Sequence, residues 1–216
     1  MPSERDTALA GLRAEAETRT RAAAGALAWA RAERIYGLAR RLARAEEADR
    51  FVVGATALLH PLPMPDVLRA LDVAGVPEEP RRAIGAALVA LTEPGRRGDP
   101  LDHRTLRDAA RLDRLGATGI AELLLATGAA GEEVYERRDP FAALRDLAPD
   151  DWALDRLYAR LTELPRRMET PTARGLAARR VGIMLFYLEA LRDEFAEALP
   201  DAILPEAHWL VPKEES

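Results

Sequence analysis

The sequence predicts an all-α protein, and three observations support that prediction. Apolar residues recur at the 3.6-residue spacing of an amphipathic helix along nearly the whole chain. Runs that alternate β-branched and polar residues, as half-buried strands do, are almost absent. Hydrophobic residues make up 48% of the 216 residues but aromatic residues only 5%, so alanine and leucine supply most of the apolar volume. Because this length suits one domain, we expect a single-domain bundle of about eight to nine helices.

The expected helices divide the chain into three parts. Residues 1–24 form a polar helical extension, since Leu9 and Leu12 are its only large apolar side chains after the start of the helix and it can bury little by itself. Residues 25–199 form the helical domain. Residues 200–216 form an irregular tail.

The helix expected over residues 25–46 carries a stripe of side chains that lie close together on a helical wheel. These side chains are Leu27, Arg31, Ile35, Leu38 and Leu42. The pattern therefore predicts that Arg31 faces inward.

The next helix covers residues 49–59 and ends at His60, because the residue before a proline is disfavoured in the α region and Pro61 follows. We expect two shorter helices over residues 66–74 and 78–92, joined by a turn that contains glycine and proline.

A further helix begins near Asp102. If it continues through Leu124, one face carries a row of mostly apolar residues, and Asp113 is a second charge directed inward. The members of that face are Leu106, Ala109, Ala110, Asp113, Ala117, Ile120 and Leu124. The same wheel directs Asp108 and Arg111 mostly away from this face.

Three more helices are expected, over residues 139–146, 150–163 and 171–199. The last one repeats apolar residues at alternating spacings of four and three. The repeat consists of Ala177, Val181, Met184, Leu188, Leu191 and Phe195. Two interpretations of this face stay open, a packed core within the chain and the seam of a homodimer.

Charge and composition exclude several classes of function. The net charge of −5 provides no positive field for nucleic acid or for an anionic membrane surface, so neither is expected as a partner. The longest apolar runs have nine residues, too few to span a membrane. The first residues lack the pattern of a secretory signal, which predicts a cytoplasmic protein. With no cysteine, thiolate catalysis and cysteine-ligated metal sites are excluded.

Three segments resemble the HD-domain phosphohydrolase superfamily, in particular its small stand-alone bacterial members. They are Arg34-Ile-Tyr-Gly-Leu-Ala-Arg-Arg-Leu-Ala, Val53-Gly-Ala-Thr-Ala-Leu-Leu-His60 and Asp108-Ala-Ala-Arg-Leu-Asp-Arg-Leu-Gly-Ala-Thr-Gly-Ile120. The resemblance implies an all-α HD-like bundle. It also implies the family's metal site, in which a histidine, a His-Asp pair and a distant aspartate hold a divalent ion that activates water for phosphoester hydrolysis.

The positions of those ligands are altered in this chain. The first histidine falls on Arg31, the His-Asp pair on His60 and Pro61, and the distant aspartate on Ala110. A guanidinium repels a cation, and proline and alanine side chains offer no ligand atom. We therefore expect no metal and no other cofactor in this degenerate site.

The resulting hypothesis is an HD fold that has lost its metal centre and uses the remaining pocket for a small organic molecule, either anionic or neutral. Acid–base or cyclisation-type chemistry without metal would rest on His60 and Arg31. Arg31, Asp113, Tyr36 and Glu33 are the candidate ligand-binding residues.

Three alternatives stay open. The chain could be a non-catalytic protein that binds or senses a metabolite, or a scaffold that only dimerises. It could also be an active phosphohydrolase with shifted ligands, drawn from Asp108, Asp113 and His60. A purely structural role for Arg31 would be an intramolecular ion pair with Asp113. If Arg31 also binds a ligand, the ligand and the aspartate would compete for it.

Overall fold

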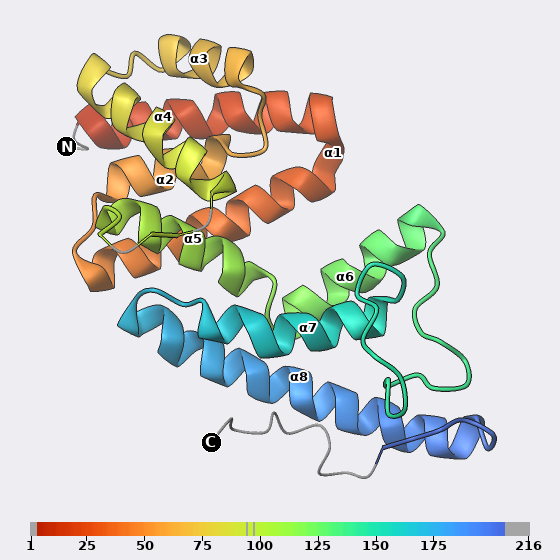
Figure 1. The fold of residues 1–216 in the computed structure, drawn as a ribbon. Helices are drawn as coiled ribbons and strands as arrows, with labels where there is room; N and C mark the ends of the chain where they lie inside the picture. The colour runs from red at the N-terminus through yellow and green to blue at the C-terminus, as the bar shows by residue number, and fades with distance from the viewer. Residues whose placement is uncertain (1–3, 94, 97, 206–216) are drawn as a thin grey trace. The chain divides into compact units, whose positions relative to one another are not determined.

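The computed structural model describes residues 4–93, 95–96 and 98–205. Eight helices and no strand occur in this part of the chain, which confirms the predicted fold class (Figure 1). The helices are α1 (Glu4–Glu46), α2 (Arg50–Leu59), α3 (Met64–Val73), α4 (Glu78–Thr92), α5 (Leu101–Asp113), α6 (Gly116–Ala130), α7 (Ala153–Arg166) and α8 (Pro171–Ala198). Within the described ranges, no helix has the length and apolarity that crossing a membrane requires.

The helices group into two compact units. Unit 1 comprises Met1–Asp113 and Glu169–Ala173, and unit 2 comprises Arg114–Met168 and Arg174–Ser216. The division of the chain at residues 24 and 199 stays a prediction, and the part of the expected tail beyond residue 205 lies outside the described residues.

Helix α1 is bent at Gly25, where its two halves meet (Figure 1). Gly25 has φ 84° and ψ −179°, a left-handed backbone that glycine adopts without a Cβ clash. The first half of α1 is polar, yet it buries Leu12 and Ala16 completely and Leu9 almost completely. The N-terminal helix therefore contributes side chains to the core of unit 1.

The second half of α1 buries only part of the face that the sequence predicts, including Ile35 and Leu42. Its buried side chains are Trp29, Ala32, Ile35, Ala39, Leu42 and Ala43. Leu27 is 60% exposed, and the Arg31 side chain is 45% exposed. The inward stripe through Leu27 and Arg31 is wrong because Trp29 and the alanines, which the wheel of large aliphatic residues omitted, define the packed face.

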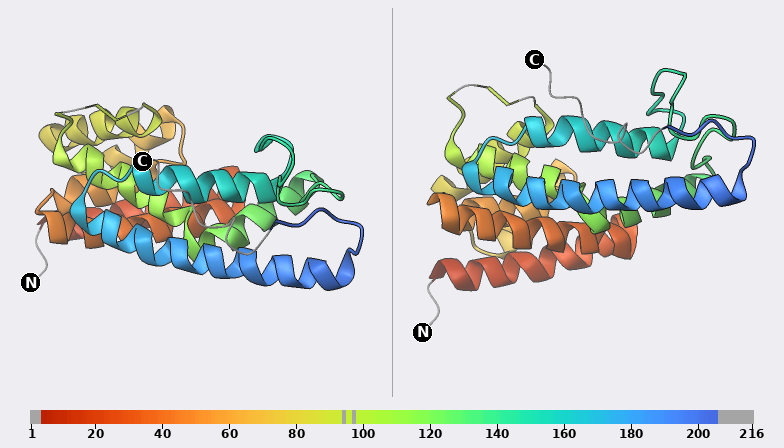
Figure 2. Two further views of the ribbon diagram at one scale, coloured as in Figure 1. Left: turned by 60° about the horizontal axis from the view of Figure 1, so that its bottom comes forward. Right: turned by 90° about the horizontal axis from the view of Figure 1, so that it is seen from below.

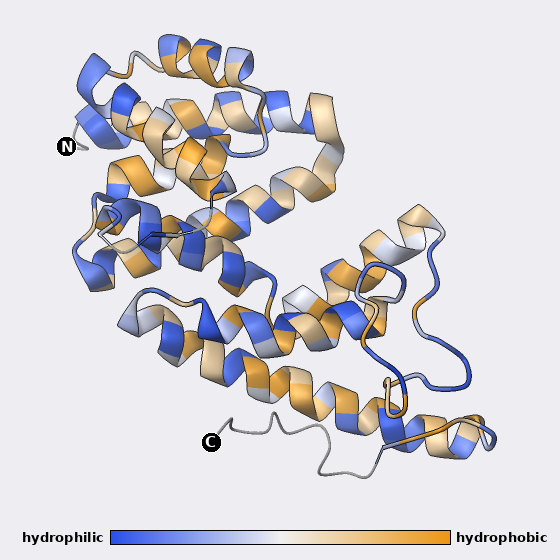
Figure 3. Ribbon diagram, viewed as in Figure 1, coloured by the Kyte–Doolittle hydropathy of each residue, from blue (hydrophilic) through white to orange (hydrophobic). Residues whose placement is uncertain are grey.

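Helix α2 is the most completely buried helix of unit 1, with every residue from Phe51 to Leu59 inside the core (Figure 3). Asp49 caps its N-terminus, since its side chain accepts hydrogen bonds from the backbone N–H groups of Phe51 and Val52. His60 is its C-cap, at the predicted position, but the predicted reason is wrong because its backbone, with φ −58° and ψ −25°, stays in the right-handed α region.

The predicted continuation of α5 through Leu124 is wrong. Helix α5 ends at Asp113, and α6 begins at Gly116, whose φ of +74° is left-handed. A Cβ at Gly116 would lie 3.2 Å from the Arg180 side chain, so both its backbone and its surroundings favour glycine. Asp113 thus stands at a helix C-terminus.

Unit 2 contains α6, α7 and most of α8, and α7 and α8 lie side by side in the views of Figures 1 and 2. The short helix expected over residues 139–146 is absent from this described segment. The Asp139 carboxylate accepts hydrogen bonds from the N–H groups of Ala143 and Leu144, and Ala142 has φ 51°, so a side-chain cap replaces helical bonding.

Helix α8 buries part of its expected apolar face. Ala177, Met184 and Leu188 are buried, whereas Phe186, which lies outside the predicted repeat, is 72% exposed. Whether this helix also takes part in a homodimer stays a prediction.

Candidate functional site

The first site is a cluster of charged residues at the end of α5, called the Asp113 cluster; its members are Arg31, Arg34, His60 and Asp113. Asp113 is only 1% exposed, so its ionised form requires partners. Arg34 donates from Nε to Oδ1 at 2.9 Å and from Nη2 to Oδ2 at 3.4 Å. Arg31 approaches more loosely, with 3.7 Å between its Nε and Oδ2.

His60 is the titratable imidazole of the Asp113 cluster. Burial lowers its pKa from the usual value, and the positive charge of Arg31 lowers it further, against the opposing effects of the Ala57 carbonyl and Asp113. Its Nδ1 lies 2.8 Å from the carbonyl oxygen of Ala57, to which it donates. In the neutral ring this bond places the lone pair on Nε2, which can then accept a proton.

The structure thus brings Arg31, His60 and Asp113 together, as the sequence analysis groups them. It does not bring Glu33 and Tyr36 to them. Both contact Arg13, which lies in the first half of α1. Glu33 forms an ion pair with Arg13, and the Arg13 guanidinium lies 5.9 Å from the centre of the Tyr36 ring. These two residues serve contacts between the halves of α1 instead.

The remaining altered positions adjoin the cluster in sequence. Pro61 follows His60, and Ala110 lies one turn before Asp113 on α5 and is partly buried. Among the residues that the structure describes, no group of three or more histidine, cysteine, aspartate or glutamate side chains is placed to hold a metal ion. The donor set near the altered positions is one imidazole and one carboxylate already engaged by two guanidiniums.

Asp108, which the helical wheel directs away from the inward face, is completely buried, so that prediction is wrong. Its carboxylate accepts hydrogen bonds from the backbone N–H groups of Glu169 and Thr170 at 2.8–3.1 Å and from the Thr170 hydroxyl at 2.9 Å. It thereby fixes the chain immediately before α8. Burial raises its pKa, although those hydrogen bonds act in the opposite direction.

Arginines complete this second group, called the Asp108 cluster and made of Asp99, Arg107, Asp108, Arg111, Glu169 and Thr170. Arg107, 4% exposed, donates to Asp99 at 2.7 Å and to both carboxylate oxygens of Glu169. Arg111, also misplaced by the wheel, contacts Asp108 and Glu169. Burial acts to raise the pKa of Glu169, but the two guanidiniums outweigh it and lower that pKa.

One sequence signal could have found this cluster. Thr170 precedes Pro171 at the start of α8, and a threonine before an N-terminal proline is typical of a helix start. Such a start needs partners for its free N–H groups. The sequence alone does not indicate that Asp108 supplies them, because the two segments lie 62 positions apart.

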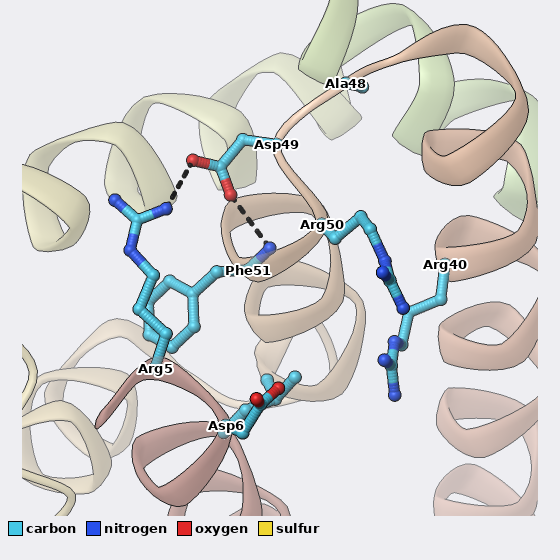
Figure 4. Close-up of a pocket in the computed structure, with 8 residues that line it drawn as sticks. Arg5, Asp6, Arg40, Ala48, Asp49, Arg50 and Phe51 are labelled. Carbon is cyan, nitrogen blue, oxygen red and sulfur yellow. Dashed lines mark hydrogen bonds and ion pairs between the residues drawn. The ribbon is translucent and has the colours of Figure 1, made fainter. Parts of the chain in front are cut away.

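Three pockets occur in unit 1 at other places. One of about 390 Å³ lies beside Asp49 at the start of α2 (Figure 4). A larger one of about 800 Å³ adjoins it, and a third of about 220 Å³ lies near Arg107. None of these three is lined by Arg31, His60 or Asp113.

The helices adopt an HD-like fold. An HD-superfamily hydrolase from Bacillus thuringiensis has a crystal structure that matches with a TM-score of 0.71 and 24% identity, over 87% of this chain and 96% of that one. At the level of the fold, this likeness confirms the resemblance seen in the helical segments. No protein-family model matches the chain.

The uncharacterised protein YpgQ of Bacillus subtilis is a relative in sequence, 28% identical over 183 residues that cover 77% of this chain and 83% of YpgQ. Its crystal structure in complex with ADP matches with a TM-score of 0.74 and 24% identity, over 89% of this chain and 97% of that one. A Lactobacillus plantarum protein matches with a TM-score of 0.68 at 26% identity, over 89% of this chain and 98% of its own.

Proposed function

We propose that this HD-like protein has lost the metal centre and uses the remaining site for a small anionic molecule. Arg31 binds the anionic group and His60 transfers a proton, so that the chemistry is acid–base chemistry without metal. Asp113 holds the two arginines in place, and an incoming anion competes with it for Arg31.

The observation that carries this proposal is the incomplete pairing of Arg31. Its side chain is 45% exposed, and in the described part of the chain its one ionic contact is the 3.7 Å approach to Asp113. Two guanidiniums share this one carboxylate, and Arg34 holds it at the shorter distance, 2.9 Å. The planar five-donor fork of arginine suits a phosphate or carboxylate group that completes its hydrogen bonds.

The ADP complex of YpgQ supports the choice of ligand class. A relative with the same fold binds a nucleoside diphosphate, and phosphate oxygens are strong acceptors for guanidinium groups. ADP is therefore the probe with which we expect binding at Arg31.

His60 suits proton transfer because its environment keeps the ring neutral. With Nδ1 donating to Ala57, Nε2 is available as a base. A cationic neighbour such as Arg31 would also stabilise negative charge that develops on a bound molecule during such a transfer.

The residues present do not fit the divalent ion that the fold family uses. A catalytic ion needs about three or more protein N or O donors, whereas the altered positions offer the imidazole of His60 alone. The guanidinium of Arg31 would repel a cation from the same place. Asp108, a candidate for a shifted ligand, is engaged with the backbone before α8.

The test is calorimetric titration of ADP with EDTA present into the wild type, Arg31→Ala and, as a matched control, Arg41→Ala, which removes an exposed arginine of the same helix. We expect the wild type and Arg41→Ala to bind alike and Arg31→Ala to lose at least about tenfold in affinity, the effect of roughly 1.4 kcal/mol. Equal affinities in all three proteins would refute the site.

A second measurement separates an enzyme from a binding protein. Products formed on incubation with ADP are followed for the wild type and for His60→Gln, which keeps a polar side chain but no titratable ring. Product formation that His60→Gln abolishes without loss of ADP binding supports catalysis. Binding without product in either protein contradicts turnover of ADP and favours a metabolite-binding protein.

A further inference from the structure

The pocket beside the start of α2, called the basic pocket, has a composition that the proposed function does not use. It has a volume of about 390 Å³ and is lined by Arg5, Asp6, Leu9, Arg40, Ala48, Asp49, Arg50 and Phe51 (Figure 4). Its charged groups are three arginines and two aspartates, an excess of one positive charge.

The carboxylate of Asp49 is already engaged by other groups. Its Oδ2 accepts from Arg5 Nη1 at 3.1 Å, while its Oδ1 accepts from the backbone N–H groups of Phe51 and Val52. These bonds cap α2 and position Arg5, so they leave Asp49 unable to neutralise the two remaining arginines of the pocket.

Arg40 and Arg50 both line the basic pocket (Figure 4). Arg40 donates to the Tyr36 hydroxyl at 2.9 Å and lies over the Tyr36 ring, both neutral partners. Over the described ranges, neither Arg40 nor Arg50 has a carboxylate within ion-pair distance. Two like charges that line one pocket repel each other, and an anion bound in the pocket would offset that repulsion.

A larger and more apolar pocket of about 800 Å³ adjoins the basic pocket, since Arg5 and Phe51 line both. Its other lining residues are Glu4, Thr7, Ala8, Gly11, Val73, Ala74, Gly75, Pro77, Glu79 and Pro80. A ligand that placed a charged group at Arg40 and Arg50 could therefore extend an apolar part past Phe51.

We infer that the basic pocket is a second ligand site, which binds the phosphate group of a small phosphate monoester with an apolar body. A phosphate dianion fits two guanidiniums better than a carboxylate does, because it offers three acceptor oxygens and more charge. The site is separate from Arg31, since Arg40 lies nine residues, or roughly 14 Å of helix, further along α1.

The test titrates inorganic phosphate and hexyl phosphate into the wild type, Arg50→Ala, Arg31→Ala and Arg41→Ala. Arg50 is exposed and makes no described ionic contact, so its removal leaves the fold intact. We expect hexyl phosphate to bind at least tenfold more tightly than phosphate, because each fully buried methylene contributes about fourfold. Arg50→Ala should weaken both ligands at least tenfold, while Arg41→Ala should bind as the wild type does, and Arg31→Ala should remove only the phosphate that the proposed ADP site binds.

Equal affinity in Arg50→Ala and the wild type would overturn the inference, and so would a loss confined to Arg31→Ala. Because ADP binding at Arg31 is measured with a different variant, the two proposals fail separately. Sedimentation with phosphatidic acid vesicles distinguishes the source of the phosphate: co-sedimentation that Arg50→Ala abolishes identifies a lipid headgroup and overturns the soluble ester. Binding of hexyl phosphate without co-sedimentation supports it.

Discussion

Helix α5 carries two buried aspartates five residues apart, and their surroundings differ. Asp108 receives hydrogen bonds from three donors immediately before α8 as well as from Arg111, and the Asp108 cluster is closed to solvent at Arg107. Asp113 is shared by the guanidinium of Arg34, at 2.9 Å, and that of Arg31, at 3.7 Å. The side chain of Arg31 is 45% exposed. The first arrangement satisfies its polar groups, whereas the second leaves donors available.

This difference distinguishes a candidate binding site, the Asp113 cluster, from a structural network of the same residue types, the Asp108 cluster. Buried charge by itself indicates neither function nor stability, since both clusters contain it. What distinguishes the Asp113 cluster is a long second ion pair, from Arg31, whose side chain is accessible to solvent. We therefore expect changes in the Asp108 cluster to alter stability and changes in the Asp113 cluster to alter binding.

The largest effect is expected for Asp108→Ala. The change leaves two backbone N–H groups and the Thr170 hydroxyl without their acceptor in the core. At roughly 1–3 kcal/mol for each unsatisfied buried group, a loss of at least about 3 kcal/mol in the free energy of unfolding follows. Denaturant unfolding measures it, and a loss below about 1 kcal/mol would break the comparison.

Asp113→Asn should have two effects of opposite sign. The free energy of unfolding should fall by about 2 kcal/mol, because the change neutralises the buried partner of Arg34. The loss is limited because solvent reaches Arg34 in part. ADP should bind more tightly, because the competing carboxylate and its negative charge are gone. Urea unfolding and calorimetry measure the two, and weaker ADP binding would contradict competition between ligand and aspartate.

Arg31→Ala should change stability by less than about 1 kcal/mol, as expected for a long, half-exposed ion pair. Arg41→Ala provides the baseline for loss of an exposed arginine on α1. A much larger loss of stability in a thermal melt would show that Arg31 stabilises the fold. The two clusters would then not differ in the way proposed.

The smallest effect concerns pH. The pKa of His60 is lowered in the folded protein, so the unfolded chain takes up the proton first as pH falls. The contribution of His60 is fully present above its unfolded pKa, near 6.5, and is lost as pH falls towards the lowered value. Relative to the wild type, His60→Gln should therefore lose less stability between about pH 7 and pH 5. Parallel pH profiles would contradict the lowered pKa.

The sequence predicts most helices because their signals are local. Caps and prolines define α2, α4 and α8 within a few residues of the observed ends. The wheel of α1 failed since it weighted large aliphatic residues and overlooked Trp29. The prediction of one continuous helix through α5 and α6 failed, because the spacing of apolar residues does not reveal the left-handed backbone at Gly116.

The candidate site is predictable only in part. Spacing along α5 places Asp113 inward correctly, and Pro61 places His60 at a helix end. The sequence did not indicate that Tyr36 and Glu33 contact Arg13, because Arg13 comes from the other side of the Gly25 bend. Contacts of this kind depend on how helices pack, which periodicity within one helix does not contain.

The most direct test of the central claim measures Mn²⁺ binding by the wild type beside a variant with the three missing ligands restored: Arg31→His, Pro61→Asp and Ala110→Asp. Titration calorimetry with metal analysis of the same samples gives the stoichiometry. We expect no stoichiometric Mn²⁺ in the wild type and one ion per chain in the restored variant. One tightly bound Mn²⁺ per wild-type chain would contradict it.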